Sequence, residues 1–109
     1  MKADTIPRPE YPRPQFVRES WINLNGVWDF EIDNGKSGAE RGLIEAPSLS
    51  GKITVPFCPE SKLSGVGITD FMECVWYKRT FTVPNEWLRP GRVTYLHIGA
   101  CDWRTTVWI

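Results

Sequence analysis

Short segments in which apolar and polar residues alternate run through this sequence, and they restrict the fold more than any other feature. In residues 24–32, Trp28, Phe30 and Ile32 fall on one side of an extended chain and the acidic residues on the other, which is typical of a half-buried strand. Other segments with the β-branched and aromatic composition of strands are residues 52–55, 75–83, 92–98 and 103–109. No segment keeps a helical period of about 3.6 residues over ten or more positions. We therefore expect an all-β fold.

The expected architecture is an antiparallel β-sandwich of the jelly-roll kind, in which two sheets bury their alternating faces against each other. The sequence supplies only about five or six strands, whereas a jelly roll has about eight, so we expect an incomplete sandwich. Ile109 lies inside an apolar segment, which favours a chain that ends within a domain. Open sheet edges would follow, and with them a tendency to form homo-oligomers.

Proline distinguishes the N-terminus from the rest of the chain. Residues 7–14 read PRPEYPRP, a composition that favours an extended polyproline chain without internal hydrogen bonds. We expect residues 1–23 to form an extended arm that packs on its own domain, with recognition by a proline-binding domain as the alternative. Residues 24–109 would then be the first part of the jelly-roll domain.

Two long stretches lack a strand pattern. Residues 36–50 are mixed and polar, and we expect a loop there after a turn at residues 33–35. Residues 56–74 exceed the roughly 12–15 residues usual for a structureless loop, and their apolar side chains predict packing against another part of the protein, such as a second domain. Arg79 falls on the apolar side of its strand, so it must find a carboxylate or carbonyl partner or reach solvent.

Composition argues against several classes of function. The 13 basic and 13 acidic residues cancel, which leaves no broad positive field for nucleic acid or an anionic membrane. Cys58, Cys74 and Cys101 are widely spaced and His97 is the only histidine, so we expect no metal site, no cofactor, and thiols that are buried and inert. Residues 1–15 lack the apolar core of a signal peptide, which favours a cytoplasmic location.

Three stretches carry a more specific pattern. They are PRP at residues 12–14 with SWINLNGVWDF at 20–30, VPF at 55–57 with VWYKRTF at 75–81, and WRTTVWI at 103–109. In these stretches the chain resembles the N-terminal sugar-binding, jelly-roll domain of glycoside hydrolase family 2, which includes β-galactosidases, β-glucuronidases and β-mannosidases. The resemblance covers nearly the whole chain but only the first part of the family's domain, and so implies a truncated domain.

The resemblance implies a non-catalytic accessory domain of a retaining β-glycosidase. In the family, a later barrel domain holds two glutamates, the acid/base and the nucleophile, which cleave the β-glycosidic bond through a covalent intermediate. The implied partners are a β-glycoside substrate and that downstream catalytic domain. The resemblance also implies that the 56–74 loop leans toward the active site, and Glu60, Ser61 and Asp70 are the candidates for substrate binding. No residue of this chain is assigned to catalysis.

The alternative is a stand-alone carbohydrate-binding or protein-interaction β-sandwich. Exposed aromatic residues can stack on sugar rings, and Trp76 and Trp108 are the candidates because their strand neighbours on the opposite face have a buried pattern. Packing in a core or between domains is the commoner use of such residues.

Overall fold

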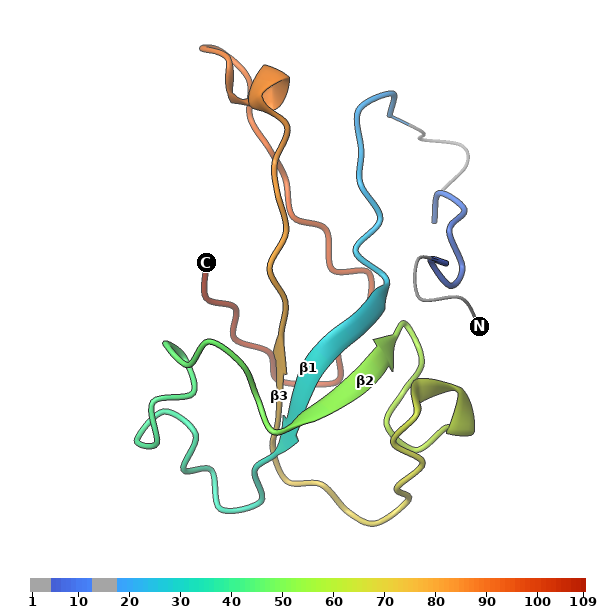
Figure 1. Cartoon of the computed structure of the whole chain (residues 1–109), viewed down its shortest axis with the longest axis vertical. Helices are drawn as coiled ribbons and strands as arrows, with labels where there is room; N and C mark the ends of the chain where they lie inside the picture. Colours follow the sequence, from blue (N-terminus) through green and yellow to red (C-terminus); the bar gives the residue numbers. More distant parts are fainter. Residues whose placement is uncertain (1–4, 13–17) are drawn as a thin grey trace. The chain divides into compact units, whose positions relative to one another are not determined.

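The computed structural model describes residues 5–12 and 18–109 of the chain (Figure 1). Its elements are β1 (Gly26–Ile32), β2 (Gly51–Val55), the 3-10 helix η2 (Lys62–Ser64), β3 (Val75–Lys78) and the 3-10 helix η3 (Asn85–Leu88). The chain divides into two compact units, Met1–Arg79 and Thr80–Ile109, and all three strands belong to the first unit. The described part of the chain contains β-strands and short 3-10 helices but no α-helix, which confirms the expected β class.

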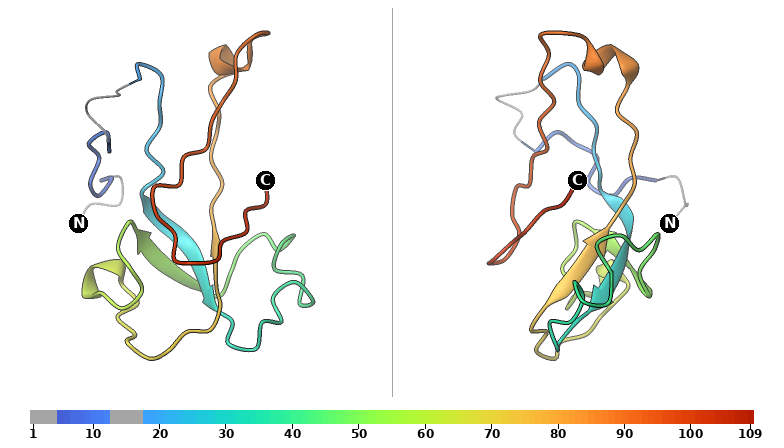
Figure 2. Two further views of the ribbon diagram at one scale, coloured as in Figure 1. Left: turned by 180° about the vertical axis from the view of Figure 1, so that it is seen from behind. Right: turned by 90° about the vertical axis from the view of Figure 1, so that its left-hand side faces the viewer.

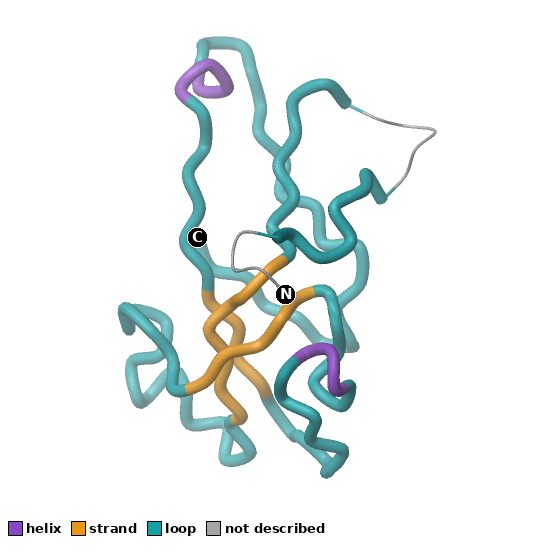
Figure 3. The backbone as a smooth tube through the Cα atoms, turned by 45° about the vertical axis from the view of Figure 1, so that its right-hand side comes forward, coloured by secondary structure: helices purple, strands orange, loops and turns teal. Residues whose placement is uncertain are grey.

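The three strands form one antiparallel sheet in the order β2-β1-β3, with β1 at its centre (Figure 3). β1 falls within the expected strand at residues 24–32, and β2 begins one residue before the expected start. β3 is shorter than expected, because it ends at Lys78 rather than at residue 83. The antiparallel sheet is therefore confirmed, and within the described ranges it forms a single layer.

The apolar face of the sheet carries the aromatic residues expected there. The strand register places Phe30 opposite Tyr77, and Trp28 opposite Ile53. The Tyr77 ring packs edge-on against Phe30, with 5.2 Å between ring centroids, and against Trp28, with 6.4 Å. Phe30 is 4% exposed and Ile53 is 1% exposed, so these two side chains form the centre of the core. Full burial of a side chain of this size contributes about 1.5–3 kcal/mol.

The opposite face of β1 is charged, and it anchors the loop of residues 36–50. The Asp29 carboxylate accepts a hydrogen bond from the Leu49 amide at 3.0 Å. The Glu31 carboxylate forms an ion pair with Arg41, with 2.6 Å between Oε2 and Nη1. The acidic residues of the alternating pattern in β1 thus fix a loop against the sheet. This face of β1 is therefore covered by the loop and does not simply face water.

Lys78 holds the same loop from β3. Its ammonium group donates hydrogen bonds to the carbonyl groups of Leu43, Ile44 and Ala46, at 2.9 Å and 3.1 Å for the first two. A loop without a strand ladder must find donors for its carbonyl groups, and an ammonium group offers three. The buried side chain of Leu43 then adds to the core from the loop side.

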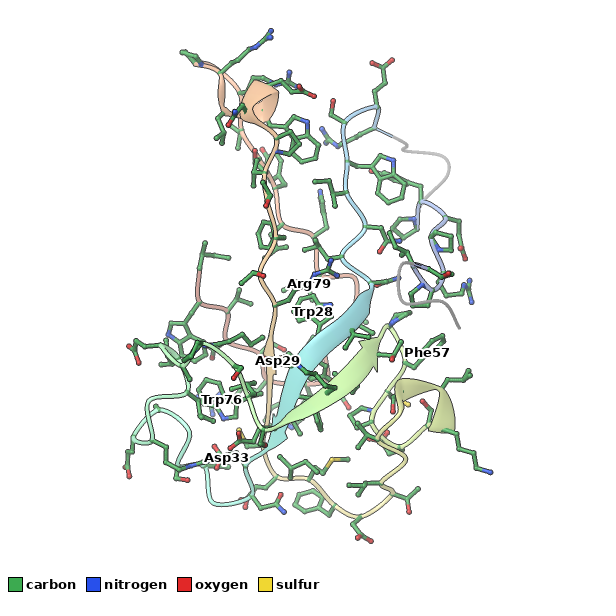
Figure 4. The ribbon with its side chains drawn as sticks, in the orientation of Figure 1. Trp28, Asp29, Asp33, Phe57, Trp76 and Arg79 are labelled. Carbon is green, nitrogen blue, oxygen red and sulfur yellow. The ribbon has the colours of Figure 1, made fainter. Side chains whose placement is uncertain are left out.

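Arg79 closes the first unit at the start of β1. Its guanidinium group donates to the carbonyl of Leu24 and, at 3.1 Å, to that of Asn25. Gly26 follows with φ +134°, a conformation that residues with a side chain rarely adopt. Of the three possibilities expected for Arg79, a carboxylate, a carbonyl group or solvent, the structure shows carbonyl partners, and Figure 4 shows the residue beside the beginning of β1.

Side-chain amides hold the described part of the N-terminal arm. Asn25 donates to the carbonyl of Pro7 at 3.1 Å, and Asn23 donates to that of Arg8 at 3.1 Å. Pro7 itself is buried. The last two residues of the proline run, 13 and 14, lie outside the described residues. The described part of the arm therefore contacts the chain just before β1.

The second unit corrects two expectations. Residues 92–98 and 103–109 were expected to form strands, but neither segment is a strand in the structure, and the chain there is extended and exposed (Figures 1 and 2). Between the expected strand at residues 75–83 and that at residues 92–98, Pro84 begins the single turn of η3. A β-branched and aromatic pattern favours an extended chain, but a strand also needs a neighbouring backbone to pair with, and local composition does not supply one.

The cysteines correct a third expectation. Cys58 and Cys101 are exposed, and only Cys74 is partly buried. Burial raises the pKa of the Cys74 thiol, which keeps that group protonated. Cys58 follows β2 in a turn and Cys101 lies in the extended second unit, so neither position faces a core.

We predict that Gly38→Ala destabilises the first unit by about 1–3 kcal/mol, because a methyl group at this buried position would overlap the Trp76 indole. Gly35→Ala is the matched control, since a methyl group there meets only the Ser37 hydroxyl at 4.0 Å. The measurement is the free energy of unfolding in urea. Equal stability of the two variants would contradict the close packing of the Trp76 ring against Gly38.

Candidate functional site

The loop of residues 56–74 holds the three residues predicted for substrate binding, and its first half is ordered by its own hydrogen bonds. The Ser61 hydroxyl donates to the Cys58 carbonyl at 2.8 Å and accepts from the Ser64 amide at 3.3 Å, which caps η2. The buried Ser64 hydroxyl donates to the Ser61 carbonyl at 2.8 Å and accepts from the Val66 amide at 3.1 Å. Serine side chains thus satisfy loop backbone groups that would otherwise need water.

Glu60 and Asp70 differ from Ser61 in their surroundings. Both are exposed, and within residues 5–12 and 18–109 their carboxylates make no hydrogen bond or ion pair. Ser61 is half-buried, and its hydroxyl is already engaged in the cap. The structure therefore does not join the three residues by hydrogen bonds. It leaves the two carboxylates accessible on an ordered loop.

An open groove of about 450 Å³ lies between the sheet and the second half of this loop. The lining residues are Phe30, Glu31, Ile32, Ser50, Gly51, Lys52, Gly65, Val66 and Ile68. None of the three predicted site residues lines it. The sequence pattern did not indicate Glu31 and Lys52 as groove residues. The two residues are far apart in the sequence, and they become neighbours only because β1 pairs with β2.

The charges of the groove are compensated. Glu31 pairs with Arg41 at 2.6 Å, and Lys52 pairs with Asp29. The hydrogen bond from Arg41 lowers the pKa of Glu31, and the hydrogen bond from Lys52 lowers the pKa of Asp29. Both carboxylates are therefore ionised and paired at neutral pH, whereas glycoside hydrolysis needs one carboxyl group that holds a proton. The groove is not built for acid–base catalysis.

Asp33 is the most densely bonded carboxylate in the described chain. It is 3% exposed, and it accepts hydrogen bonds from the amides of Ser37 (2.9 Å) and Gly38 (2.8 Å) and from the Trp76 indole (2.9 Å). The Arg41 guanidinium lies 3.4 Å away. The Trp76 hydrogen bond and the Ser37 amide hold the pKa of Asp33 well below its ordinary value. Figure 4 shows Asp33 and Trp76 close together at one end of the sheet.

This arrangement decides how Trp76 is used. Its indole N–H is committed to Asp33, and Gly38 lies against the ring. Trp76 therefore belongs to the packing of the first unit. Trp108, the other tryptophan considered for sugar stacking, is exposed and lies in the second unit.

Two other kinds of site are not found in the described residues. No group of three or more His, Cys, Asp or Glu side chains among them is placed to hold a metal ion. No helix in the same ranges has the length and apolar character needed to cross a bilayer.

Comparison with known proteins relates the chain to one class of enzyme, although no family model matches it. The chain is 31% identical over 107 residues to a β-glucuronidase of Canis lupus familiaris and to one of Felis catus. It is 28% identical over 100 residues to a β-glucuronidase of Paenibacillus borealis. Each match covers 91% of this chain but only 16% of the relative.

The matched part of these relatives is their N-terminal segment. The chain is thus distantly similar, over most of its length, to the beginning of enzymes of the glycoside hydrolase type, and in particular of β-glucuronidases. The resemblance read from the sequence is confirmed at this level.

We predict that Asp33→Asn flattens the loss of stability in acid. The folded-state pKa of Asp33 is depressed, so its contribution is present above the unfolded pKa of about 3.9 and is lost as the pH falls below that value. The measurement is the free energy of unfolding between about pH 2.5 and 7. Asp70→Asn is the control, because that carboxylate makes no bond within the described chain. An unchanged acid slope in Asp33→Asn would contradict the assignment.

Proposed function

We propose that the chain is the N-terminal accessory segment of a retaining β-glycosidase of the β-glucuronidase type. In this proposal it is the first part of a jelly-roll domain, and it packs on a downstream catalytic domain whose active site it helps to shape. One observation carries the proposal: 91% of the chain matches β-glucuronidases, over 16% of their length. The enzymatic chemistry is then the work of residues outside this chain.

The site geometry supports a non-catalytic role. A retaining glycosidase places its acid/base and its nucleophile about 5–5.5 Å apart, and the acid must carry a proton at working pH. The buried or partly buried carboxylates described above are committed to ion pairs or to backbone amides. Glu60 and Asp70 are exposed to solvent, whereas a catalytic acid is typically held in an apolar pocket.

The exposed apolar side chains of the 56–74 loop support docking to another domain. Phe71 is 85% exposed, and Leu63 is exposed on the same loop although its backbone belongs to the ordered η2. An ordered loop that presents large apolar groups to water is typical of an interaction surface. Packing of this loop against a catalytic domain would bury these groups and bring Glu60 and Asp70 to the domain boundary.

The alternative function is a stand-alone carbohydrate-binding or protein-interaction module. The observation that favours it is Trp103, which is 86% exposed and free to offer a ring face to a sugar. The use of Trp76 in the Asp33 cluster counts against it, because this tryptophan of β3, a candidate for sugar stacking, is committed to the protein's own packing.

We expect the 109-residue chain alone to hydrolyse no aryl β-glycoside, and the polypeptide extended by its natural downstream sequence to hydrolyse an aryl β-glucuronide. The reason is that, in the part of the chain that the structure describes, the buried and partly buried carboxylates are engaged in ion pairs or bonded to backbone amides, so none serves as an acid beside a nucleophile. The measurement is release of the aryl group under identical conditions. An inactive extended polypeptide, together with heat released when the isolated chain is titrated with simple sugars, would favour the stand-alone module.

In the extended polypeptide, we predict that Glu60→Gln or Asp70→Asn lowers kcat/KM about tenfold, because a hydrogen bond between a carboxylate and substrate contributes about 1.5–3 kcal/mol. Ser61→Ala should act through the loop, since it removes the cap of η2. Glu40→Gln, an exposed acid on the other loop, is the matched control. Unchanged kinetics in both carboxylate variants would remove them as substrate-binding residues.

A further inference from the structure

The loop of residues 36–50 is joined to the sheet by side chains and not by a strand ladder. Within the described ranges, the backbone groups of residues 37–49 form hydrogen bonds with one another, as from the Leu43 amide to the Gly38 carbonyl at 2.9 Å, and their backbone makes none to the backbone of a strand. The loop is therefore a locally bonded segment that lies on the sheet.

Both ends of this loop lie at the same end of the sheet. The chain leaves β1 just before Asp33, and it enters β2 at Gly51, which pairs with Phe30 of β1. The two ends are thus continuous with neighbouring strands that pair with each other. A segment attached in this way can lift from the sheet face while the ladder between the two strands stays intact, which is the arrangement of a local opening.

Four charged side chains, which we call the latch, hold the loop closed: Asp29, Glu31, Asp33 and Lys78. The three carboxylates accept hydrogen bonds from amides of the 37–50 segment at distances between 2.8 and 3.3 Å. The Lys78 ammonium group donates to three carbonyl groups of the same segment. Each contact joins a charged group to a backbone group, and such charge-assisted hydrogen bonds are stronger than neutral ones.

The latch carboxylates are ionised at neutral pH, because hydrogen bonds from Lys52, Arg41 and Trp76 lower the pKa of Asp29, Glu31 and Asp33 respectively. Their contribution is present above the unfolded pKa, about 3.9 for Asp and about 4.3 for Glu, and it is lost as the pH falls through the lower folded value. The other titratable groups near the latch belong to β2, to the loop and to the residues before β3. They are Lys52, which pairs with Asp29; Arg41, which pairs with Glu31 and Asp33; and Cys74, near Asp33, with the ion pair of Lys36 and Glu73.

From these contacts we infer that residues 37–49 form a strap, which opens as one unit when the latch is broken by acid or by loss of the Lys78 charge, while the three strands stay paired. Burial of Leu43 and Leu49 keeps the strap closed as long as the latch is intact. Opening uncovers the face of the sheet that carries Trp76, whose ring lies against the closed strap. The inference concerns contacts within the first unit and does not rest on the proposed function.

Amide hydrogen exchange, measured by NMR on the unaltered chain, tests the strap without a substitution. Turns of a few residues are not stable in water by themselves, so the amides of Arg41, Leu43 and Ala46 exchange once the strap opens. We expect the protection factors of these three amides to fall together, at least about tenfold between about pH 7 and about pH 2.5, while the best protected amides of β1 change less. Unchanged protection in the strap, or an equal fall in the strap and in β1, would overturn the inference.

Lys78→Met tests the latch at neutral pH, because it removes the ammonium group and keeps most of the aliphatic stem. We expect the same three amides to lose protection at least about tenfold, since hydrogen bonds from a charged donor are lost, and the amides of β1 to keep theirs. Lys62→Met is the matched control, an exposed lysine in η2, and it should leave both sets unchanged. Strap protection equal to that of the control, or a loss of protection in strap and strands alike, would show that no separate strap exists.

Discussion

The buried Asp33 carboxylate is the interaction on which the arrangement of the first unit depends. It lies at the end of β1, where its own amide donates to the Cys74 carbonyl at 2.8 Å and so connects β1 to the chain that enters β3. Its side chain binds the amides of Ser37 and Gly38, which begin the long loop, and the Trp76 indole. One ionised group thus fixes three segments that are far apart in the sequence, because a buried charge must be met by several donors at once.

Charged side chains also hold the long loop along the rest of this sheet face. Asp29 and Glu31 project from the face opposite the aromatic residues, and Lys78 joins them from β3. In a solvated sheet these residues would face water, but here they hold the loop of residues 36–50 through its amides and carbonyl groups. Leu43 and Leu49 are buried as a result. Charged side chains therefore organise one side of this small unit, and aromatic packing organises the other.

This division bears on function. The carboxylates of Asp29, Glu31 and Asp33 stabilise the fold, and each is ionised and bound to a cation or to backbone amides. Glu60 and Asp70 remain outside these networks, on a loop that is ordered by serine side chains and that exposes Phe71. In the function that we propose, this surface contacts another domain or a bound substrate, and the match to the N-terminal segment of β-glucuronidases supports that proposal.

The amino-acid pattern by itself determined the β class, the positions of β1 and β2, the turn at residues 33–35 and the need of Arg79 for a polar partner or solvent, because alternation, turn residues and the cost of burying a charge are local properties. It also carried the resemblance to the N-terminal segment of glycosidases. Only the tertiary structure decided that Trp76 donates to Asp33, that the 36–50 loop covers the charged face, and that residues 92–98 and 103–109 form no strand. The physical reason is that a strand or a buried charge is completed by partners distant in sequence, and a local pattern states the need for a partner without saying which one meets it.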